Sequence, residues 1–456
     1  MDHLTNIIEG LREEMTETLA RWIKIPSVKG EAAPGAPFGA EVRRALDVAL
    51  EDAEKMGFKV RNFDGYAGDV RMGPEGVNPL AILAHLDVVP AGDGWQTDPF
   101  GADLIDGKMY GRGTSDDKGP AVAGLYAMYA AKKAGIPLNR EIRLILGCDE
   151  ETGMACMKYY AKHCDMPRSG FSPDANFPVI NTEKGLLHLD LGGEYTAEGL
   201  RVKEISVGER PNVIPGLASA LLEGDESLCE KANQAAKELG LDVKAEMQEG
   251  LVKITATGIP GHAAFPAPAR NAIGMLLLVL KELGVKGALE TLADRVGMQY
   301  DGLGLGVKCE DQVSGPLTCN LGILRYSEQN GLYATLDIRY PILCDHKALT
   351  ASIVAALEPC VQVKVDSQKD PHHVAPNSKL VTALMEAYAE VTGDTEAKPM
   401  AIGGGTYAKM LEEGVAFGSL FPDEEELAHQ AGEYISIDSL VKNLYIFVKA
   451  IEKLQD

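Results

Sequence analysis

The chain has 456 residues, of which 44 are Lys or Arg and 67 are Asp or Glu, so its formal net charge at pH 7 is −23. Hydrophobic residues make up 45% and charged residues 24%, which is ordinary for a folded protein and argues against disorder, collagen and coiled coil. The acidic balance, without a Lys/Arg-rich run, argues against nucleic acid or an anionic membrane as a partner. This length predicts more than one domain.

Three features bear on the compartment. Residues 1–25 carry charges throughout, which is typical of an amphipathic helix and not of a secretory signal. The apolar stretch 121–131 is too short to span a bilayer, which takes about 20 residues. The 8 Cys residues form no C-x-x-C motif, and no N-x-[ST] sequon occurs. This usage favours thiols in a reducing compartment, so we predict a cytoplasmic protein.

Strand and helix patterns alternate from residue 78 onward. Residues 78–89 are typical of a buried strand that runs into a loop, residues 119–135 of a helix with Pro120 in its first turn, and residues 141–151 of another strand. This order predicts a mostly parallel sheet covered by helices. Polar residues at the carboxyl ends of such strands are the expected place for a ligand site.

The pattern changes after Thr182. Strand patterns at 186–195, 251–262 and 331–341 are interleaved with helical patterns at 226–240, 270–284 and 345–359, and helices return at 377–393 and 437–454. We therefore predict an α/β fold in two parts. Residues 1–182 and 376–456 form one domain, and residues 183–375 form an inserted α+β domain that is long enough to hold two similar α/β subdomains.

Several common enzyme motifs are missing from the sequence. No H-E-x-x-H, P-loop or G-x-S-x-G motif occurs, and the segment 302–306 lacks the last glycine of a dinucleotide fingerprint. The Gly run at 403–405 is more typical of a tight loop than of a ligand-binding backbone. What remains is a series of acidic and imidazole side chains at predicted strand ends.

His85 and Asp87 are the first of these. Residues i and i+2 of a strand share one face, and a metal-binding imidazole commonly gives its other N–H to a carboxylate. The spacing therefore suits a metal ligand with its orienting partner. Alone, however, a His after a strand is more often an ordinary core or surface residue.

Two acidic loops follow in the chain. Asp116 and Asp117 adjoin a predicted helix, where they are either helix caps or candidates to bridge two cations. Glu150 and Glu151 follow a strand and point different ways, so one can bind metal while the other takes a proton from water. Acidic loop tips are usually just solvated. Two further candidates, each weak alone, are Asp174 and His429.

In combination these segments resemble the M20 metallopeptidase family of dinuclear zinc exopeptidases, and within it the PepV-like dipeptidases related to carnosinases. The resemblance covers nearly the whole chain through the segments HLDVVPAGDGW, YGRGTSDDKG, DEETG, SPDANFPV, GIPGHAAFP, IGGGTYAKM and FGSLFPDEEELAHQAGEY. It implies one metal held by His85, Asp116 and Asp174 and a second held by Asp116, Glu151 and His429. It also implies that Glu150 is the general base and that Asp87 orients His85.

The resemblance further implies that the insert is a lid over the substrate. His262 would reach the oxyanion, Asn212 would help to bind it, and Arg339 would bind the terminal carboxylate of the substrate, as suits a guanidinium. The alternative is that His262 and Asn212 are turn residues and Arg339 a surface charge. An enlarged lid of this kind implies a monomer. Lys409 stands where related sequences often carry Arg, which leaves its role open.

The activity that the resemblance implies is hydrolysis of unblocked dipeptides by water activated between two divalent metal ions, with zinc the first expectation and manganese or cobalt as alternatives. The expected partner is thus a small peptide substrate. A second hypothesis is deacylation of N-acyl or N-succinyl amino acids by the same architecture. A third is a peptide-binding relative without catalysis, which Glu150 beside a full ligand set disfavours.

Overall fold

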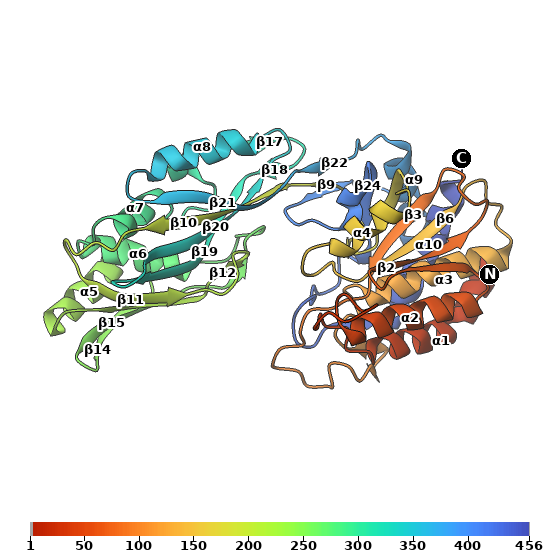
Figure 1. Cartoon of the computed structure of the whole chain (residues 1–456), viewed down its shortest axis with the longest axis horizontal. Coiled ribbons are helices and arrows are strands. Elements are labelled where there is room, and N and C mark those ends of the chain that lie inside the picture. The colour runs from red at the N-terminus through yellow and green to blue at the C-terminus, as the bar shows by residue number, and fades with distance from the viewer. Residues whose placement is uncertain (1–2, 456) are drawn as a thin grey trace. The chain divides into compact units, whose positions relative to one another are not determined.

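The computed structural model describes residues 3–455 and divides into two compact units (Figure 1). The first contains residues 3–181, 374–400 and 405–455, and the second contains residues 182–373 and 401–404. Each unit has its own cluster of buried hydrophobic residues. Chains of this length commonly contain more than one core.

The first unit is built on a sheet in the strand order β1-β2-β6-β3-β7-β24-β9. The central strands β6, β3, β7 and β24 run parallel, and β1, β2 and β9 pair antiparallel at the two sides. The strands of this sheet are β1 (Lys59–Phe63), β2 (Ala67–Met72), β3 (Leu80–His85), β6 (Ile142–Gly147), β7 (Ser169–Ser172), β9 (Val179–Glu183) and β24 (Glu413–Phe417), with β22 (His372–His373) and β23 (Met400–Ile402) paired to β9.

Helices cover both faces of this sheet. A Cβ on Gly68 of β2 would lie within 3.0 Å of the Leu46 and Leu50 side chains of α2, whereas the next residue, Asp69, accepts a hydrogen bond from Tyr160 of α4. Adjacent strand residues point to opposite faces, so α2 and α4 lie on different sides. The helices are α1 (His3–Ile23), α2 (Ala40–Lys55), α3 (Lys118–Ala134), α4 (Ala155–His163), α9 (Lys379–Thr392), α10 (Ile437–Lys453) and the short η2 (Tyr407–Met410).

Burial explains the strand sequences of this unit. Every residue of β3 (LAILAH) and of β6 (IRLILG) is buried, as is typical of parallel strands covered on both faces. The one charged residue of β6, Arg143, donates to buried Glu141 at 2.6 Å. The predicted α/β class with a mostly parallel sheet is therefore confirmed. Short strands at its periphery are β4 (Asp103–Ile105), β5 (Lys108–Tyr110), β8 (Ala175–Asn176), β25 (Ser419–Leu420) and β26 (Tyr434–Ser436).

The second unit is built on an antiparallel sheet in the order β14-β15-β13-β11-β19-β20-β10-β21. Its strands are β10 (Gly185–Gly193), β11 (Val202–Val207), β13 (Leu217–Leu222), β14 (Val243–Gln248), β15 (Leu251–Thr257), β19 (Thr318–Ser327), β20 (Gly331–Tyr340) and β21 (Gln362–Lys369). Its helices are α5 (Glu226–Leu239), α6 (Ala272–Glu282), α7 (Ala288–Arg295), α8 (His346–Leu357) and η1 (Leu303–Leu305).

This sheet consists of two halves with one order of elements. In one half β11, β13, α5 and β14 follow each other along the chain, and in the other β19, β20, α8 and β21 do so. The strands β15 and β10 take the same place in the two halves, between the second and the outermost strand. Because β11 pairs with β19, the halves form one continuous sheet. Two short pairs complete this unit, β12 (Val213–Ile214) with β16 (Gly261–His262) and β17 (Glu310–Asp311) with β18 (Gly315–Pro316).

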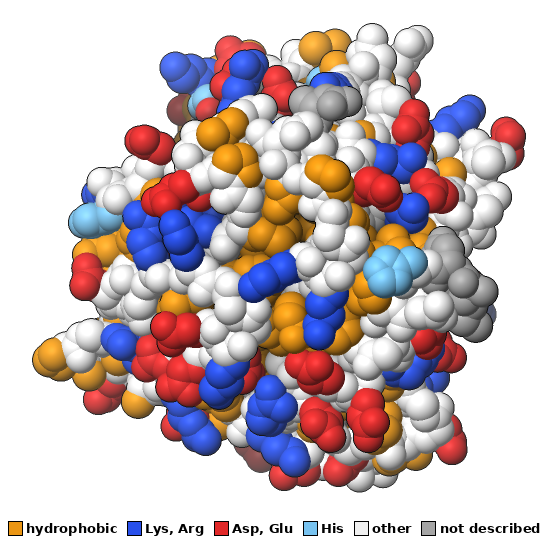
Figure 2. Space-filling view, turned by 90° about the vertical axis from the view of Figure 1, so that its right-hand side faces the viewer, with side chains coloured by type: hydrophobic (Ala, Val, Ile, Leu, Met, Phe, Trp, Pro, Cys, Tyr) orange, Lys and Arg blue, Asp and Glu red, His pale blue; other side chains and the backbone are white. Residues whose placement is uncertain are grey.

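Two features describe the surface. Figure 2 shows Asp/Glu and Lys/Arg side chains interleaved on the face that it presents, with hydrophobic side chains between them. None of the helices within residues 3–455 combines the length and the apolar character that crossing a membrane requires.

Candidate metal centre

Three of the sequence-predicted ligands lie at or after the carboxyl ends of the parallel strands in the first unit, and two lie in loops that reach the same place. His85 is the last residue of β3, and Glu151 follows β6. Asp174 follows β7, and His429 lies in the connection after β24. Asp116 stands just before α3. The sheet thus brings together residues that are up to 344 positions apart, because parallel strands end at the same edge.

Asp116 is shared by two groups of side chains. Its Oδ1 lies 3.0 Å from His85 Nε2, and its Oδ2 lies 3.0 Å from His429 Nε2. Asp174 Oδ2 is 3.7 Å from His85 Nε2, and Glu151 Oε1 is 3.0 Å from His429 Nε2. In each group of three, one candidate ligand atom per residue lies within 4.8 Å of the others. Asp116 therefore offers one oxygen to each group.

The two imidazoles are surrounded by carboxylates. Partial desolvation opposes protonation of His429, whose side chain is 45% exposed, but its hydrogen bonds with Asp116 and Glu151 raise its pKa to about 10. Burial likewise opposes protonation of His85, yet its contact with Asp116 raises the pKa of this imidazole well above its usual range. Burial alone would raise the pKa of Asp116, and the bonds to both imidazoles more than offset this, so its pKa is lowered. Positive charge at this place is strongly stabilised.

The remaining carboxylates repel one another. Burial, followed by the charge of Asp116, raises the pKa of Asp174 well above its usual range. Burial also raises the pKa of Glu150 to about 8; His85 opposes this shift, and the negative charges of Glu151 and Asp116 add to it. So many acidic groups cannot all ionise side by side without a cation.

The donor set fits divalent cations. Carboxylate oxygens and neutral imidazole nitrogens are ligands that zinc, manganese and cobalt accept. Each group supplies three protein ligands, as many as the catalytic zinc sites of other enzymes use while a position stays open for water or substrate. The residues present are thus suited to a pair of divalent ions with Asp116 between them.

Asp87 links the first ligand to the loop of the predicted base. Its backbone oxygen accepts from His85 Nδ1 at 2.8 Å, whereas its carboxylate is 3.6 Å from that nitrogen. The two carboxylate oxygens accept the backbone N–H groups of Glu150 and Glu151 at 3.1 and 3.2 Å. One residue therefore orients the imidazole through its carbonyl and holds the acidic loop through its side chain.

Asp117 does not cap the helix that follows it. Its side chain makes no capping hydrogen bond to α3 and instead accepts the backbone N–H of His85 at 2.9 Å. Asp117 thus stands at the N-cap position of α3, but its carboxylate is used to hold the end of β3 and not to cap the helix by a hydrogen bond. Lys409, whose role the sequence left open, lies half-buried on η2.

Two buried residues next to the ligands carried no predicted role. Glu433 and Arg112 form an ion pair with 2.5 Å between Nη1 and Oε2, and both side chains are almost fully buried. The only sequence signal for them is that both fall within motif segments of the family resemblance. Their partnership was not predictable, since the two residues lie in loops 321 residues apart and no strand pattern brings these loops together.

Three predicted site residues lie in the second unit. Asn212 and His262 are neighbours, because β12 pairs with β16 and the Asn212 carbonyl accepts the N–H of Ala263 at 2.9 Å. His262 Nδ1 accepts the N–H of Ala264 at 3.3 Å. A neutral imidazole that accepts at Nδ1 carries its proton on Nε2.

Arg339 is already engaged within this unit. It is 7% exposed, and its Nε and Nη2 donate to both oxygens of Asp337 at 2.6 and 2.7 Å. Its Nη1 donates to the Gly403 carbonyl at 2.9 Å. His188 Nε2 lies 2.9 Å from the same Asp337 carboxylate. The guanidinium is therefore held rigidly, and a ligand would meet only its remaining N–H groups.

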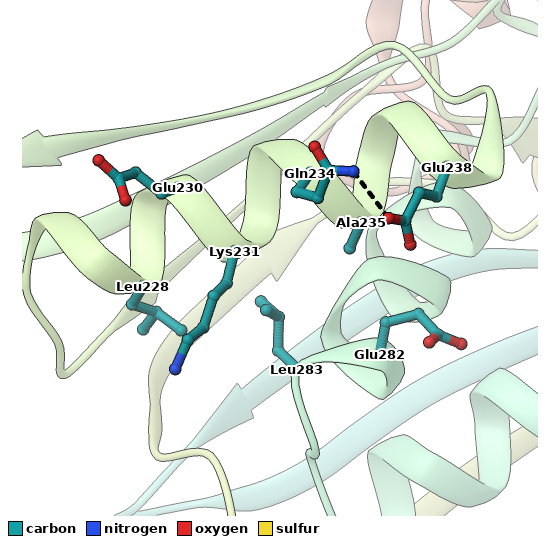
Figure 3. A pocket seen from close by; sticks show the side chains of 8 residues that line it. All are labelled: Leu228, Glu230, Lys231, Gln234, Ala235, Glu238, Glu282 and Leu283. Carbon is teal, nitrogen blue, oxygen red and sulfur yellow. Dashed lines mark hydrogen bonds between the residues drawn. The ribbon is translucent and has the colours of Figure 1, made fainter.

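A cavity of about 620 Å³ in the second unit is separate from all these residues. It is an open groove between α5 and the end of α6, with Leu228 and Leu283 among its lining and Gln234 bonded to Glu238 across one α5 turn (Figure 3). None of the predicted ligands or substrate-binding residues lines it. The candidate chemistry is therefore not in this groove.

An acidic cluster with two histidines at the carboxyl edge of a parallel sheet, in a chain with a second α+β unit, is the arrangement of a metal-dependent peptidase. The model of peptidase family M20/M25/M40 matches residues 81–453, and the chain belongs to this family. The family resemblance drawn from the sequence is thereby confirmed. The chain is similar to a Bacillus subtilis (strain 168) protein named "Putative dipeptidase YtjP", with 37% identity over 455 residues that cover 97% of each chain.

Further similarities agree with this assignment. A protein of Staphylococcus aureus (strain bovine RF122 / ET3-1) named "Putative dipeptidase SAB1611c" is 33% identical over 462 residues, covering 98% of each chain. The crystal structure of human carnosine dipeptidase 1 matches with a TM-score of 0.61 and 16% identity, over 100% of this chain and 99% of that one. Dug1p of Saccharomyces cerevisiae matches with a TM-score of 0.59 and 14% identity, over 99% and 98%. These two structures establish the shared fold.

Proposed function

We propose that this M20-family peptidase is a metal-dependent dipeptidase that hydrolyses unblocked dipeptides. The single observation that carries the proposal is the position of Asp116, whose two carboxylate oxygens face two separate ligand groups. A carboxylate in this position is suited to bridge two divalent ions. The names of the relatives in Bacillus subtilis and Staphylococcus aureus support the substrate class.

We assign one ion to His85, Asp116 and Asp174 and the other to Asp116, Glu151 and His429, in keeping with the two groups. When bound, the ions supply Lewis acidity, which lowers the pKa of water and polarises the scissile carbonyl. Zinc is our first choice, with manganese or cobalt as alternatives, since supply and geometry decide among them.

Glu150 acts as the general base in this proposal. It follows the ligand-bearing strand β6, and its backbone N–H is held by Asp87 at 3.1 Å. Its carboxylate takes a proton from the attacking water and returns it to the leaving amine. Burial, with the negative charges of Glu151 and Asp116, raises the pKa of Glu150 to about 8. Bound cations would lower this pKa, so that the carboxylate is ionised and can accept the proton.

The second unit binds the substrate in this proposal. His262 donates from Nε2 to the oxyanion of the tetrahedral intermediate, in agreement with its acceptor role at Nδ1. Asn212 directly precedes the paired strand β12, where its carbonyl accepts the N–H of Ala263 at 2.9 Å, and it assists. Arg339 directs its remaining N–H groups to the terminal carboxylate of the dipeptide, while Asp337 fixes the guanidinium plane.

We further propose that the second unit is a lid that closes for turnover, and that the protein works as a cytoplasmic monomer. All eight cysteines within the described chain are free thiols, as a reducing compartment would keep them.

Paired assays test the substrate class. We expect Ala-Ala to be cleaved in the presence of zinc or manganese. N-acetyl-Ala-Ala should be cleaved at least 100-fold more slowly, since the proposed site accepts a dipeptide with a free amino group. The measurements are the release of free alanine, which reports cleavage of the peptide bond, and the release of acetate, which reports deacylation, joined to metal analysis of the same preparation. Cleavage of the acetylated substrate alone would establish the deacylase alternative. Two bound ions without cleavage of either substrate would favour a binding protein.

A further inference from the structure

The first inference concerns Glu433, which lies four residues after His429. Its side chain is completely buried, and one oxygen, Oε1, accepts several N–H groups of the loop before α3. The backbone N–H groups of Gly113 and Ser115 lie 2.9 and 3.0 Å away, and that of Asp116 lies at 3.3 Å. The Ser115 hydroxyl donates to the same oxygen at 3.2 Å. The backbone that carries Asp116 is therefore wrapped around this carboxylate.

Arg112 extends the contact to a third loop. Its Nη1 donates to Glu433 Oε2 at 2.5 Å, and its Nη2 donates to the Ala91 carbonyl at 3.1 Å. Its guanidinium lies 5.4 Å from the centre of the Trp95 ring. Residues 91–95 belong to the loop that follows β3 and His85. One ion pair thus fastens three loops, each of which carries or adjoins a candidate metal ligand.

Burial of this ion pair costs desolvation free energy, which the contacts of the two side chains must offset. A buried charge is tolerated only when it is paired and fully hydrogen-bonded, and Glu433 meets this condition through loop N–H groups rather than through a helix or strand. Such converging N–H groups fix the course of a loop around an anion. The arrangement is therefore one that determines where Asp116 and His429 stand.

We propose that Glu433 and Arg112 are positioning residues that hold Asp116 and His429 at the separation that two shared cations require. The inference rests on the proposed metal ligands and adds residues that neither bind metal nor touch substrate. Loss of the Glu433 charge frees the loop of residues 111–116, so the bridging carboxylate loses its fixed orientation. Removal of such outer partners typically weakens metal binding by about 10- to 100-fold.

The test is metal binding by the whole chain in the wild type, Glu433→Gln and Glu141→Gln. Glu141 is a matched control, since it is 1% exposed and pairs with Arg143 at 2.6 Å in the same unit. Each apoprotein is titrated with zinc against a chelator, and its Tm is measured without metal. We expect both variants to have a lowered Tm, and only Glu433→Gln to bind at least one ion about 10-fold or more weakly.

The outcomes separate this inference from the proposed function. A wild type that binds fewer than two ions would contradict the metal centre itself. A wild type that binds two ions, together with Glu433→Gln affinities within twofold of it, would contradict the positioning role alone. If Glu433→Gln does not fold, the Arg112→Lys variant replaces it in this test. Lysine keeps the positive charge but lacks the two-pronged guanidinium, so metal binding by this variant should be several-fold weaker.

The second inference concerns two cysteines of the second unit, and it is independent of the metal centre. The Sγ atoms of Cys309 and Cys344 lie 2.7 Å apart, and both residues are partly buried. Cys309 directly precedes β17, and Cys344 lies between β20 and α8. The two thiols are closer than non-bonded sulfur atoms normally come and need only a small shift to reach the bonding distance of about 2.05 Å.

The segments that carry these cysteines are held together without the sulfur atoms. Asp311 accepts the N–H of Leu343 at 3.3 Å through Oδ2, and the Ser314 hydroxyl accepts the N–H of Ile342 at 3.0 Å. The carbonyl of Cys309 also accepts the N–H of Leu317 at 2.8 Å. The backbone around the two thiols is therefore held in place by hydrogen bonds, and a bond between the sulfur atoms needs little movement of it.

We propose that Cys309 and Cys344 form a reversible disulfide when the protein meets a low-molecular-weight disulfide such as glutathione disulfide. One protein thiol attacks glutathione disulfide and releases one glutathione thiol, and the other attacks the resulting mixed disulfide and releases the second. The S–S bond of glutathione disulfide breaks as the protein S–S bond forms. The two hydrogen atoms of the protein thiols end on two glutathione molecules, so the exchange is balanced.

Peptide mapping of the full chain without reduction tests this pair. After incubation with glutathione disulfide we expect a crosslinked peptide that contains Cys309 and Cys344, whereas an exposed single cysteine such as Cys360 can only carry glutathione. Cys344→Ser should abolish this peptide. Cys360→Ser, which removes an exposed cysteine, should leave it unchanged. Alkylation of both Cys309 and Cys344 after the incubation would refute the pair.

Discussion

An Asp116→Ala variant is expected to lose both metal ions and, with them, activity down to background. The reason is the position of the side chain: its Oδ1 is 3.0 Å from His85 Nε2, and its Oδ2 is 3.0 Å from His429 Nε2. Removal of a ligand that belongs to one group only, as in His85→Ala, should weaken the binding of one ion more than that of the other. The measurement is metal content after dialysis, together with dipeptide hydrolysis.

Asp423→Ala is the control for this prediction. Asp423 is an exposed carboxylate in the same long connection as His429 and belongs to neither ligand group. Its variant should keep two ions and wild-type turnover. If Asp116→Ala retained two ions per chain, the bridging role of this carboxylate would be disproved.

A Glu150→Gln variant is expected to keep its metal and lose its turnover. The amide cannot take a proton from water, so kcat should fall on the order of 10²- to 10⁴-fold. Its backbone N–H still bonds to Asp87, because this bond does not involve the replaced side chain. KM should change little. The measurements are kcat and KM for Ala-Ala and the metal content of the same sample.

The neighbouring Glu151→Gln variant is the matched comparison. Glu151 lies 3.0 Å from His429 Nε2 and is one of the second group of candidate ligands. The same chemical change one residue along should therefore weaken metal binding, whereas Glu150→Gln should not. A Glu150→Gln enzyme with kcat within tenfold of the wild type would show that another group removes the proton.

The grouping of the ligands could be predicted from the sequence because their position follows from strand direction. His85 and Glu151 each stand at or just after the end of a strand, β3 or β6, that is apolar enough to recognise. The strand β7 before Asp174 has the sequence SGFS, so the role of Asp174 came from the family resemblance. Parallel strands end at one edge, so residues in these places meet whatever the length of the connections. The family resemblance then supplied His429, whose own surroundings carry no such pattern.

The contacts between distant loops could not be predicted. Nothing in the sequence pairs Arg112 with Glu433, because the partners of a buried charge depend on how loops cross in space and not on spacing along the chain. The two contacts of Asp87 were equally unpredictable. Its carbonyl accepts a hydrogen bond from His85, and its carboxylate accepts one from the backbone of Glu150.

In the second unit, one contact was within reach of the sequence and another was not. Asp337 and Arg339 are two residues apart on β20 and share a face, so their ion pair follows from strand periodicity. The meeting of Asn212 with His262 depends on the pairing of β12 with β16, two strands of two residues each. Strands this short leave no periodic signal.

The place of β24 has a consequence for how the protein is made. This strand, residues 413–417, lies between β7 and β9, pairing parallel with the first and antiparallel with the second. A nascent chain has released β7 and β9 from the ribosome more than 200 residues before β24 emerges. Until then both strands expose unpaired edges, which are sites of aggregation. Completion of the sheet, and of the ligand set that its edge carries, must await the end of translation.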